Sequence, residues 1–587
     1  MDLLKNEIQP LVENAVATMG VEPGLVGRLL QPARELDQGD LSLPCFAFAK
    51  TLGMAPAAIA EQLCEALPAH EAVDSITAVN GYLNVRASPA WLAQQVLAGK
   101  HRQSGHKARR EVLIEHTSAN PNGPFHVGRA RNAILGDTLV RLHRLWGDRV
   151  TAEYYVDDMG KQVAVLAWAL ENMSEEEVET LLADREPVNP QWADKADHRR
   201  VRWYQAAQRQ RKESTEANRI EDDIGALVHA SEHGDEAVLA AFEAAYQPVL
   251  DGMLETLGRL GIQFDRFTKE SVFVTNGDVA RLMEELGGLE INGVADNGAQ
   301  FLDLGQRGLK GKTEFFYRRG DGSSLYATRD IAYHRWKWSQ CNELINVLGE
   351  DHKLQAQQVG LTLEELGERR PEVMFYSFIK LPEGKMSTRR GNVVFMDDLL
   401  EEAQAHAVEV LKERRPDLDE AAMTNIAEAV GTSAVRFNII SVSPEKGFTF
   451  RWEDALSFEA GSAPFIMYSH TRACSIQAKV QALLGGETKP EDTEVPESST
   501  MPAGLVQLLR TLAVHDDRLE KVVREHRPNL FAEYMLHLAT AYNTFYRDCY
   551  IISEGEVNAF YYAVSELARA TLKAGMEGLG VVPLTTM

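Results

Sequence analysis

The segment from residue 111 to residue 146 restricts the fold more than any other part of the chain. The run EVLIEH has the length and composition of a buried strand, and a loop rich in Pro, Asn and Gly follows it. Apolar residues then recur at helical spacing: Ala130, Ile134, Leu135, Leu139, Leu142 and Leu145. A strand, a tight loop and a helix form the opening unit of a doubly wound α/β domain. We therefore predict a Rossmann-like parallel sheet, to which VTAEYYVDD, ELINVLG and VMFYSFI contribute further strands.

The remaining sequence divides around this α/β core. The first 100 residues combine helical spacing with a strand-like GYLNVRAS, which indicates a small α+β unit. A charged segment without strand signals, about 172–260, is predicted to be a helical insertion. Strand signals end near residue 397, and amphipathic helices continue to the end. The predicted units are 1–100, 108–395 with the insertion, a helical linking region 396–455, and an all-helical domain 456–587.

Composition excludes some classes of protein. A chain of 587 residues is long enough for three or four domains, and no apolar run approaches the ~18 residues that span a membrane. The start lacks the apolar core of a secretory signal, and the five scattered cysteines form no Cys-x-x-Cys pair, which together favour a reducing cytoplasm. A net charge of −25 argues against non-specific nucleic-acid binding, although local basic patches can still bind a nucleic acid.

The loop after the first strand is a predicted phosphate-binding site. Pro121 to Arg129 leads directly into the helix, and a helix N-terminus offers unpaired N–H groups and a positive dipole end. Gly128 allows a nucleotide to approach the backbone, and His126 is a candidate donor to a phosphate oxygen. A surface Pro/Gly turn with an incidental histidine is the alternative for this motif taken alone.

A second loop strengthens the prediction. Gly384 to Asn392 reads GKMSTRRGN and follows the strand VMFYSFI, so its lysine and arginines are expected near the same sheet edge. Lys385 supplies a mobile charge, and the flanking glycines allow the loop to open and close.

Together the two loops resemble the HIGH and KMSK signatures of class I aminoacyl-tRNA synthetases. The chain departs from both signatures, with Arg129 in place of the second histidine and Thr388 in place of the final lysine. The resemblance implies catalytic roles for His126, Gly128, Lys385 and Ser387. It implies ATP binding, with Mg²⁺ carried by the nucleotide, by His126, Gly128, Arg129, Lys385, Met386, Ser387 and Arg389.

The longer string IEHTSANPNGPFHVG resembles the arginyl family in particular, which implies that Glu115 and Asn120 bind the amino-acid end of arginine. LYATRDIA matches the same family and places Tyr326 and Asp330 four residues apart, on one helical face. A carboxylate can accept the planar guanidinium fork bidentately, so Asp330 is the predicted specificity residue. His352 and Asp351 follow the strand ELINVLG, and His352 is included as an arginine-binding candidate. The run from Asp158 through Gly160 to Gln162 is predicted to support the site.

The C-terminal helices resemble the anticodon-binding domain of this family. Tyr468, Arg472 and Met587 are the predicted tRNA-binding residues, since aromatic and arginine side chains can stack on unpaired bases. The N-terminal unit resembles the family domain that contacts the outer corner of tRNA. The basic run at 198–212 is either an acceptor-arm contact or a solvated helix face.

These features predict an enzyme that ligates arginine to tRNA(Arg) through arginyl-adenylate, as a cytoplasmic monomer with no resident metal. Three alternatives are open. A cysteine-specific synthetase would need a zinc site, for which the scattered cysteines offer no ligand set. A non-catalytic paralogue is consistent with the departures at Arg129 and Thr388. A small-molecule adenylyltransferase would have no use for the helical end.

Overall fold

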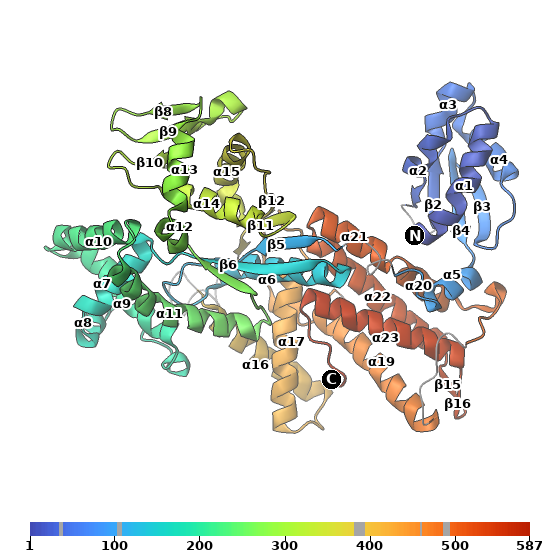
Figure 1. The fold of residues 1–587 in the computed structure, drawn as a ribbon. Helices are drawn as coiled ribbons and strands as arrows, with labels where there is room; N and C mark the ends of the chain where they lie inside the picture. The colour runs from blue at the N-terminus through green and yellow to red at the C-terminus, as the bar shows by residue number, and fades with distance from the viewer. Residues whose placement is uncertain (34–38, 103–108, 381–393, 458–460, 485–492) are drawn as a thin grey trace.

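A computed structural model describes residues 1–33, 39–102, 109–380, 394–457, 461–484 and 493–587. Its centre is a five-stranded parallel sheet of order β12-β11-β5-β6-β7 (Figure 1). The strands are β5 (Glu111–Glu115), β6 (Arg149–Val156), β7 (Arg266–Lys269), β11 (Glu343–Gly349) and β12 (Glu372–Tyr376). The first strand of the sheet is β5. The next strands, β6 and β7, lie on one side of it, and the later strands, β11 and β12, lie on the other side. The strand order therefore reverses between β5 and β11. The Rossmann-like fold class predicted from the sequence is confirmed.

The apolar character of β5 follows from its central position. Val112, Leu113 and Ile114 are all buried, as expected for a parallel strand covered on both faces. Helix α6 (Val127–Trp146) packs closely against it, because a Cβ atom at Gly136 would lie 2.2 Å from the Cβ of His116. Three further helices cover the sheet: α7 (Lys161–Asn172), α14 (Tyr326–Trp338) and α15 (Lys353–Glu365).

Two insertions extend the sheet unit. The first contains the helices α8 (Glu175–Leu181), α9 (Ala196–Glu213), α10 (Ala217–Glu232) and α11 (Glu236–Arg259). The second lies between β7 and α14 and was not predicted. It contains α12 (Ser271–Thr275), α13 (Asp278–Gly287) and an antiparallel sheet of β8 (Asn292–Val294), β9 (Gln300–Asp303) and β10 (Glu314–Arg318). Its strands are three to five residues long, too short for a clear alternation of apolar and polar residues.

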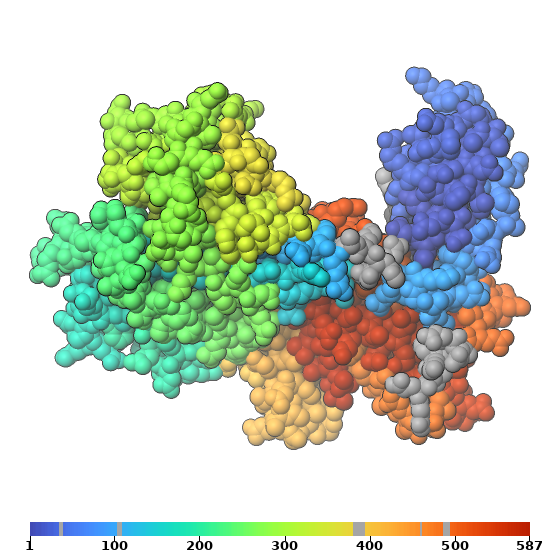
Figure 2. Space-filling view, in the orientation of Figure 1, coloured from blue at the N-terminus to red at the C-terminus, as the bar shows by residue number. Residues whose placement is uncertain are grey.

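The N-terminal unit is α+β, as predicted. A four-stranded antiparallel sheet has the order β1-β2-β4-β3. Its strands are β1 (Gln31–Pro32), β2 (Leu41–Pro44), β3 (Val73–Val79) and β4 (Tyr82–Ala87). The helices are α1 (Asp2–Thr18), α2 (Val26–Leu29), α3 (Phe46–Leu52) and α4 (Pro56–Ala66), and α5 (Pro89–Leu97) leads away to the C-terminal helices. Figure 2 shows the N-terminal unit standing apart from the parallel-sheet unit, with the C-terminal helices beneath the N-terminal unit.

Helices dominate the chain after residue 395. They are α16 (Met396–Arg414), α17 (Glu420–Ile440), α18 (Trp452–Ala455), α19 (Ala463–Leu484), α20 (Ala503–Ala513), α21 (His515–Glu525), α22 (Pro528–Asp548) and α23 (Ala559–Leu579). Short strands interrupt them, which the sequence analysis did not predict. β14 (Phe448–Thr449) pairs with β13 (Ile379–Lys380), and β15 (Ile552–Ser553) pairs with β16 (Glu556–Val557). Within the described residues, no helix is both apolar enough and long enough to span a membrane.

Candidate active site

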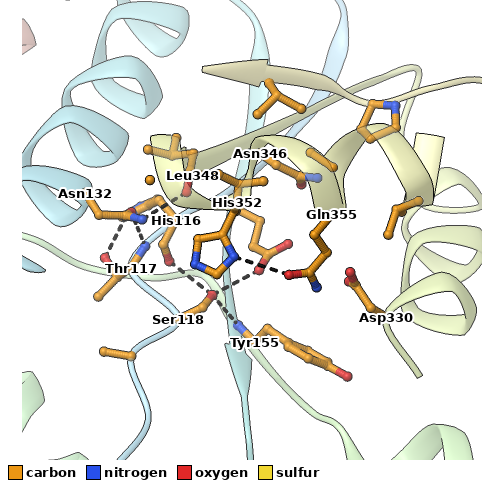
Figure 3. A pocket seen from close by; sticks show the side chains of 18 of the residues that line it. His116, Thr117, Ser118, Asn132, Tyr155, Asp330, Asn346, Leu348, His352 and Gln355 are labelled. Atoms are coloured by element: carbon orange, nitrogen blue, oxygen red, sulfur yellow. Dashed lines mark hydrogen bonds between the residues drawn. The ribbon is translucent and has the colours of Figure 1, made fainter. Parts of the chain in front are cut away.

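A cavity of about 420 Å³ opens at the carboxyl ends of β5, β6, β11 and β12 (Figure 3). In an open α/β sheet, ligands bind beyond the strand ends where the strand order reverses, which here is between β5 and β11. The cavity is lined mainly by polar side chains, and they come from strands, from the loop after β5 and from α14 and α15. Its position and lining make it the candidate active site.

All five residues predicted to bind arginine line this cavity: Glu115, Asn120, Tyr326, Asp330 and His352. They come from three places in the chain, which the parallel sheet brings together. Glu115 is the last residue of β5, Tyr326 begins α14, and Asp330 lies one turn later. The grouping is consistent with the predicted roles, which remain predictions.

The carboxylate of Asp330 is kept ionised by its neighbours. Burial alone would raise its pKa, but nearby His334 and Lys337 and a hydrogen bond from Gln355 together lower it below the ordinary value. The Nδ1 atom of His334 lies 3.1 Å from Oδ1 of Asp330. An ionised, partly desolvated carboxylate is the group that a guanidinium would pair with.

Glu115 stands at the start of a strained turn. Thr117 and Ser118 have φ angles of +67° and +36°, which residues other than glycine seldom adopt. The turn is held by hydrogen bonds, since the Thr117 amide donates to Oδ1 of Asn132 at 2.6 Å and the Ser118 hydroxyl donates to Glu115 at 3.1 Å. Asn132 also donates to the carbonyl of Val347 at 2.9 Å, so one side chain of α6 ties together the ends of β5 and β11.

The loop after β5 is anchored to α7. The side-chain amides of Asn120 and Asn122 donate to Oε1 of Gln162 at 3.1 and 2.7 Å. This contact agrees with a supporting role for the segment that contains Gln162. Asp158 in the same segment points elsewhere and accepts two hydrogen bonds from Ser271, at the start of the second insertion.

The predicted phosphate-binding residues lie at the N-terminus of α6. Arg129 lines the cavity, whereas His126 and Gly128 are not among its lining residues. A Cβ at Gly128 would lie 3.0 Å from Nδ1 of His126, so glycine leaves room for the imidazole over the first turn. Burial, with a smaller effect from Arg129, lowers the pKa of His126 to about 4, and the imidazole is therefore neutral near pH 7.

Lys385, Met386, Ser387, Thr388 and Arg389 lie outside the described residues, so their predicted roles are not tested. The chain on the C-terminal side of that segment is described, and it lies against the first loop. The amide of Val127 donates to the carbonyl of Val394 at 3.0 Å, and the amide of Met396 donates to Phe125 at 2.7 Å. Val394 and Met396, which follow the second predicted loop in the chain, thus lie beside the first loop.

Sequence reasoning missed several polar residues at the site. Gln355 lines the cavity, as does Tyr155, whose buried hydroxyl has no hydrogen-bond partner among the described residues. Glu270, at the end of β7, pairs with Arg329 and has an unpartnered Oε2 atom within the described structure. Burial raises the pKa of Glu270 to about 8, although Arg329 opposes the shift. The four-residue strand β7, which Glu270 directly follows, was not predicted from the sequence, so no signal pointed to Glu270.

The three predicted tRNA-binding residues lie in the C-terminal helical region. The guanidinium of Arg472 lies between the rings of Tyr468 and Tyr546, 4.9 and 4.7 Å from their centroids. Tyr468 is 43% exposed, so part of the residue is open to solvent. The carbonyl of Met587 accepts a hydrogen bond from Arg415 at the end of α16. The arrangement leaves their predicted roles open.

Three arginines of the basic run in α9 form ion pairs with acidic residues of the same insertion. Arg202 pairs with Glu179, Arg209 with Asp184 and Arg211 with Glu221. These ion pairs hold the insertion together and do not favour an acceptor-arm contact, and they also show that the run is more than the solvated helix face given as the alternative. Two groups of His and carboxylate side chains in the described structure have metal-like proximity, Asp197/His198/Asp397 and Glu343/Glu372/His526. Each already contains a paired cation, Lys195 in the first and Arg110 in the second.

Comparison with known proteins decides the family. Residues 92–452 match the family described as tRNA synthetases class I (R), catalytic domain. Residues 466–587 match the DALR anticodon binding domain, and residues 6–87 match the arginyl tRNA synthetase N terminal domain. The chain belongs to the arginyl-tRNA synthetase family. The family resemblance predicted from the two loops and the LYATRDIA motif is confirmed.

Relatives in the arginyl-tRNA synthetase family extend over nearly the whole chain. The arginine-tRNA ligase of Methanocella arvoryzae is 40% identical over 93% of each chain, and that of Methanococcoides burtonii is 36% identical over 98% of each. Among solved structures, the arginyl-tRNA synthetase of Thermus thermophilus superposes with a TM-score of 0.78 at 25% identity, covering 99% of this chain and all of the other.

Proposed function

We propose that this chain ligates L-arginine to tRNA(Arg), using ATP and releasing AMP and pyrophosphate. One observation carries the proposal beyond family membership. The carboxylates of Glu115 and Asp330 belong to two different elements, β5 and α14. Both line the one cavity that lies where the strand order reverses, between β5 and β11. Arginine has two cationic ends, the α-ammonium and the guanidinium, and the two carboxylates would match this positive charge.

Substrate positioning and charge supply the first step. An oxygen of the arginine carboxylate attacks the α-phosphorus of MgATP, the bond to the β-phosphate breaks, and pyrophosphate leaves. His126 and Arg129 at the start of α6 would hold phosphate oxygens, with Lys385, Ser387 and the neighbouring Met386 and Arg389 of the second loop closing over them. No side-chain nucleophile is required, because proximity and complementary charge lower the barrier.

The second step transfers arginine to tRNA. The 2′-hydroxyl of the terminal adenosine attacks the adenylate carbonyl, and AMP leaves. In this proposal the helices after residue 456 bind the anticodon through Tyr468, Arg472 and Met587, and the N-terminal unit contacts the outer corner of the tRNA. The enzyme works as a cytoplasmic monomer. A cysteine-specific activity finds no support, since none of the described residues that line the cavity is a cysteine.

The test is ATP–pyrophosphate exchange with a panel of amino acids, with and without total tRNA. Exchange with arginine alone among the panel, dependent on added tRNA, is the expected result. Absence of exchange with every amino acid, although tRNA still binds, would reject the enzyme and leave the non-catalytic paralogue. Exchange with a different amino acid would reject the assigned pocket.

A further inference from the structure

A buried carboxylate at the start of α16 is held by three side chains of the first insertion. Asp397 is 1% exposed and lies in the first turn of the helix. Lys195 and His198 contact its Oδ2 atom at 2.8 and 2.9 Å. The Thr256 hydroxyl donates to its Oδ1 atom at 2.9 Å and also accepts a hydrogen bond from Lys195 at 2.6 Å, so the contacts form one closed network.

The carboxylate of Asp397 is ionised within this network. Burial would raise its pKa, but hydrogen bonds from His198 and Lys195 lower the pKa below the ordinary value. An ionised carboxylate only accepts hydrogen bonds, so Nε2 of His198 carries a proton and donates it to Oδ2. Hydrogen bonds to an ionised group are shorter and stronger than neutral ones, and they therefore fix the first turn of α16 against the insertion.

The residues just before Asp397 are bound to the first loop. Residues 394–396 run antiparallel to residues 125–127, and Phe395 is paired with His126. Two backbone hydrogen bonds, of 2.7 and 3.0 Å, hold the two short segments together. Because Asp397 directly follows this bridge, the side chains that hold Asp397 also determine where the bridge lies.

Helix α9 contacts both segments of the bridge region. The ring of His198 packs edge-on against Phe395, with 5.3 Å between the ring centroids. Val201, on the next turn, packs against the first loop, since a Cβ added at Gly123 would lie 2.5 Å from its side chain. Neither Lys195 nor His198 is among the described residues that line the cavity. Any effect of these two side chains on the substrates would therefore pass through the residues that they hold.

We infer that Lys195 and His198 are positioning residues for ATP. They hold Asp397, and the adjoining bridge then fixes His126 at the start of α6. The inference rests on the proposed function in one respect, the contact of His126 with phosphate oxygens. Apolar residues of similar volume are often at least as stabilising as a buried ion pair, so stability alone does not explain charged groups here. The alignment of a phosphate-binding side chain does.

Calorimetric binding of two ligands tests the inference. Adenosine has the base and ribose alone, whereas α,β-methylene-ATP adds a triphosphate that cannot be cleaved at the α-phosphorus. His198→Leu leaves two donors on the carboxylate. It should weaken binding of the ATP analogue roughly 10- to 100-fold, as expected for a lost hydrogen bond to a charged group, and change adenosine binding by no more than about twofold. Unchanged binding of the analogue, or equal losses for both ligands, would overturn the inference.

A conservative variant and a matched control separate positioning from stability. Glutamine can place an N–H near the position of Nε2, so His198→Gln should recover most of the affinity lost in His198→Leu. Arg202→Met removes another almost fully buried cation of α9, whose ion pair with Glu179 lies within the insertion. It should lower the Tm and bind the ATP analogue as the wild type does. An equal loss of analogue binding in Arg202→Met would show that any loosening of the insertion has this effect.

Lys195→Met removes a different donor to the same carboxylate and should act in the same direction. It takes the place of His198→Leu in each comparison if that variant does not fold. In a His126→Asn background, both substitutions should lose most of their effect on the analogue, because coupled residues are not additive. A full effect in that background would contradict an action through His126. A wild-type protein that binds the analogue but shows no arginine-dependent exchange would instead reject the proposed function.

Discussion

At the scale of single residues, the charge on Asp330 sets the expected specificity. Asp330→Asn keeps the size of the side chain and removes the anion, so kcat/KM for arginine should fall roughly 10- to 100-fold, in line with a charged hydrogen bond of 1.5–3 kcal/mol. Citrulline, the neutral analogue, should then compete about as well as arginine. Steady-state charging kinetics with both compounds measure this. An unchanged preference for arginine over citrulline would show that Asp330 does not recognise the guanidinium.

The imidazole of His116 should make the fold sensitive to acid. Burial is the largest cause that lowers its pKa from 6.5 to about 4, and the surrounding charges act in both directions. The unfolded chain takes up a proton near pH 6.5 and the folded chain does not. Stability is therefore complete above pH 6.5 and decreases as the pH falls toward 4, by roughly 3 kcal/mol in all.

Replacement by asparagine tests this contribution. In His116→Asn the difference in apparent Tm between pH 7.5 and pH 5 should be smaller than in the wild type. Any cavity left by the shorter side chain lowers both values and cancels from that difference. The half-exposed His406 provides the control variant, His406→Asn. A wild-type difference in His116→Asn would show that other groups cause the acid sensitivity.

At the scale of elements, the contact between α6 and β5 has no room for an added methyl group. Gly136→Ala would push a Cβ to 2.2 Å from His116, so α6 would have to move away from the strand that carries Glu115. We expect a destabilisation of about 1–3 kcal/mol and a higher KM for arginine. Gly225→Ala, at an exposed position of helix α10, meets no atom within 4 Å and should stabilise by about 0.5–1 kcal/mol. Thermal unfolding of the two variants should therefore move in opposite directions.

The sequence predicted elements where a long pattern was present. β5 and α6 were recognisable because a fully buried strand is apolar throughout and a 20-residue helix repeats its apolar face several times. The sheet of β8, β9 and β10 was missed, since each strand is too short to show a period. Tyr326 and Asp330 were found as a pair, but the same helical stripe continues to His334 and Lys337. The hydrogen-bond partners of these two side chains, Glu115 and Asn346, lie on the strands β5 and β11. A single sequence does not show which strands become neighbours.

At the scale of the whole molecule, Arg436 joins three parts of the chain. This fully buried side chain on α17 pairs with Asp137 of α6 at 2.6 Å, and it donates to the carbonyls of Leu260 and Leu579. Removing one member of a buried ion pair typically costs about 3–5 kcal/mol. Arg436→Met should therefore lower the Tm and reduce the stimulation of ATP–pyrophosphate exchange by tRNA.

The matched control for Arg436 is Arg141→Met. Arg141 also pairs with Asp137, at 2.7 Å, but it is 30% exposed, so its loss should have a smaller effect on both quantities. Equal tRNA stimulation in the wild type and Arg436→Met would show that this contact stabilises the fold without linking the helical end to the reaction.

Helix α6 belongs to the region that matches the catalytic-domain family, and it also contacts helices of the region that matches the anticodon-binding family. Its N-terminus carries His126, and further along it contacts α17, α21, α22 and α23. A Cβ at Gly578 of α23 would come within 3.2 Å of both Leu142 and Leu145 of α6, so the two helices are in close contact. In evolutionary terms, the C-terminal helices are not an exchangeable module. A gene fusion that replaced them would also have to redesign the outer face of α6, the helix that follows the predicted nucleotide-binding loop.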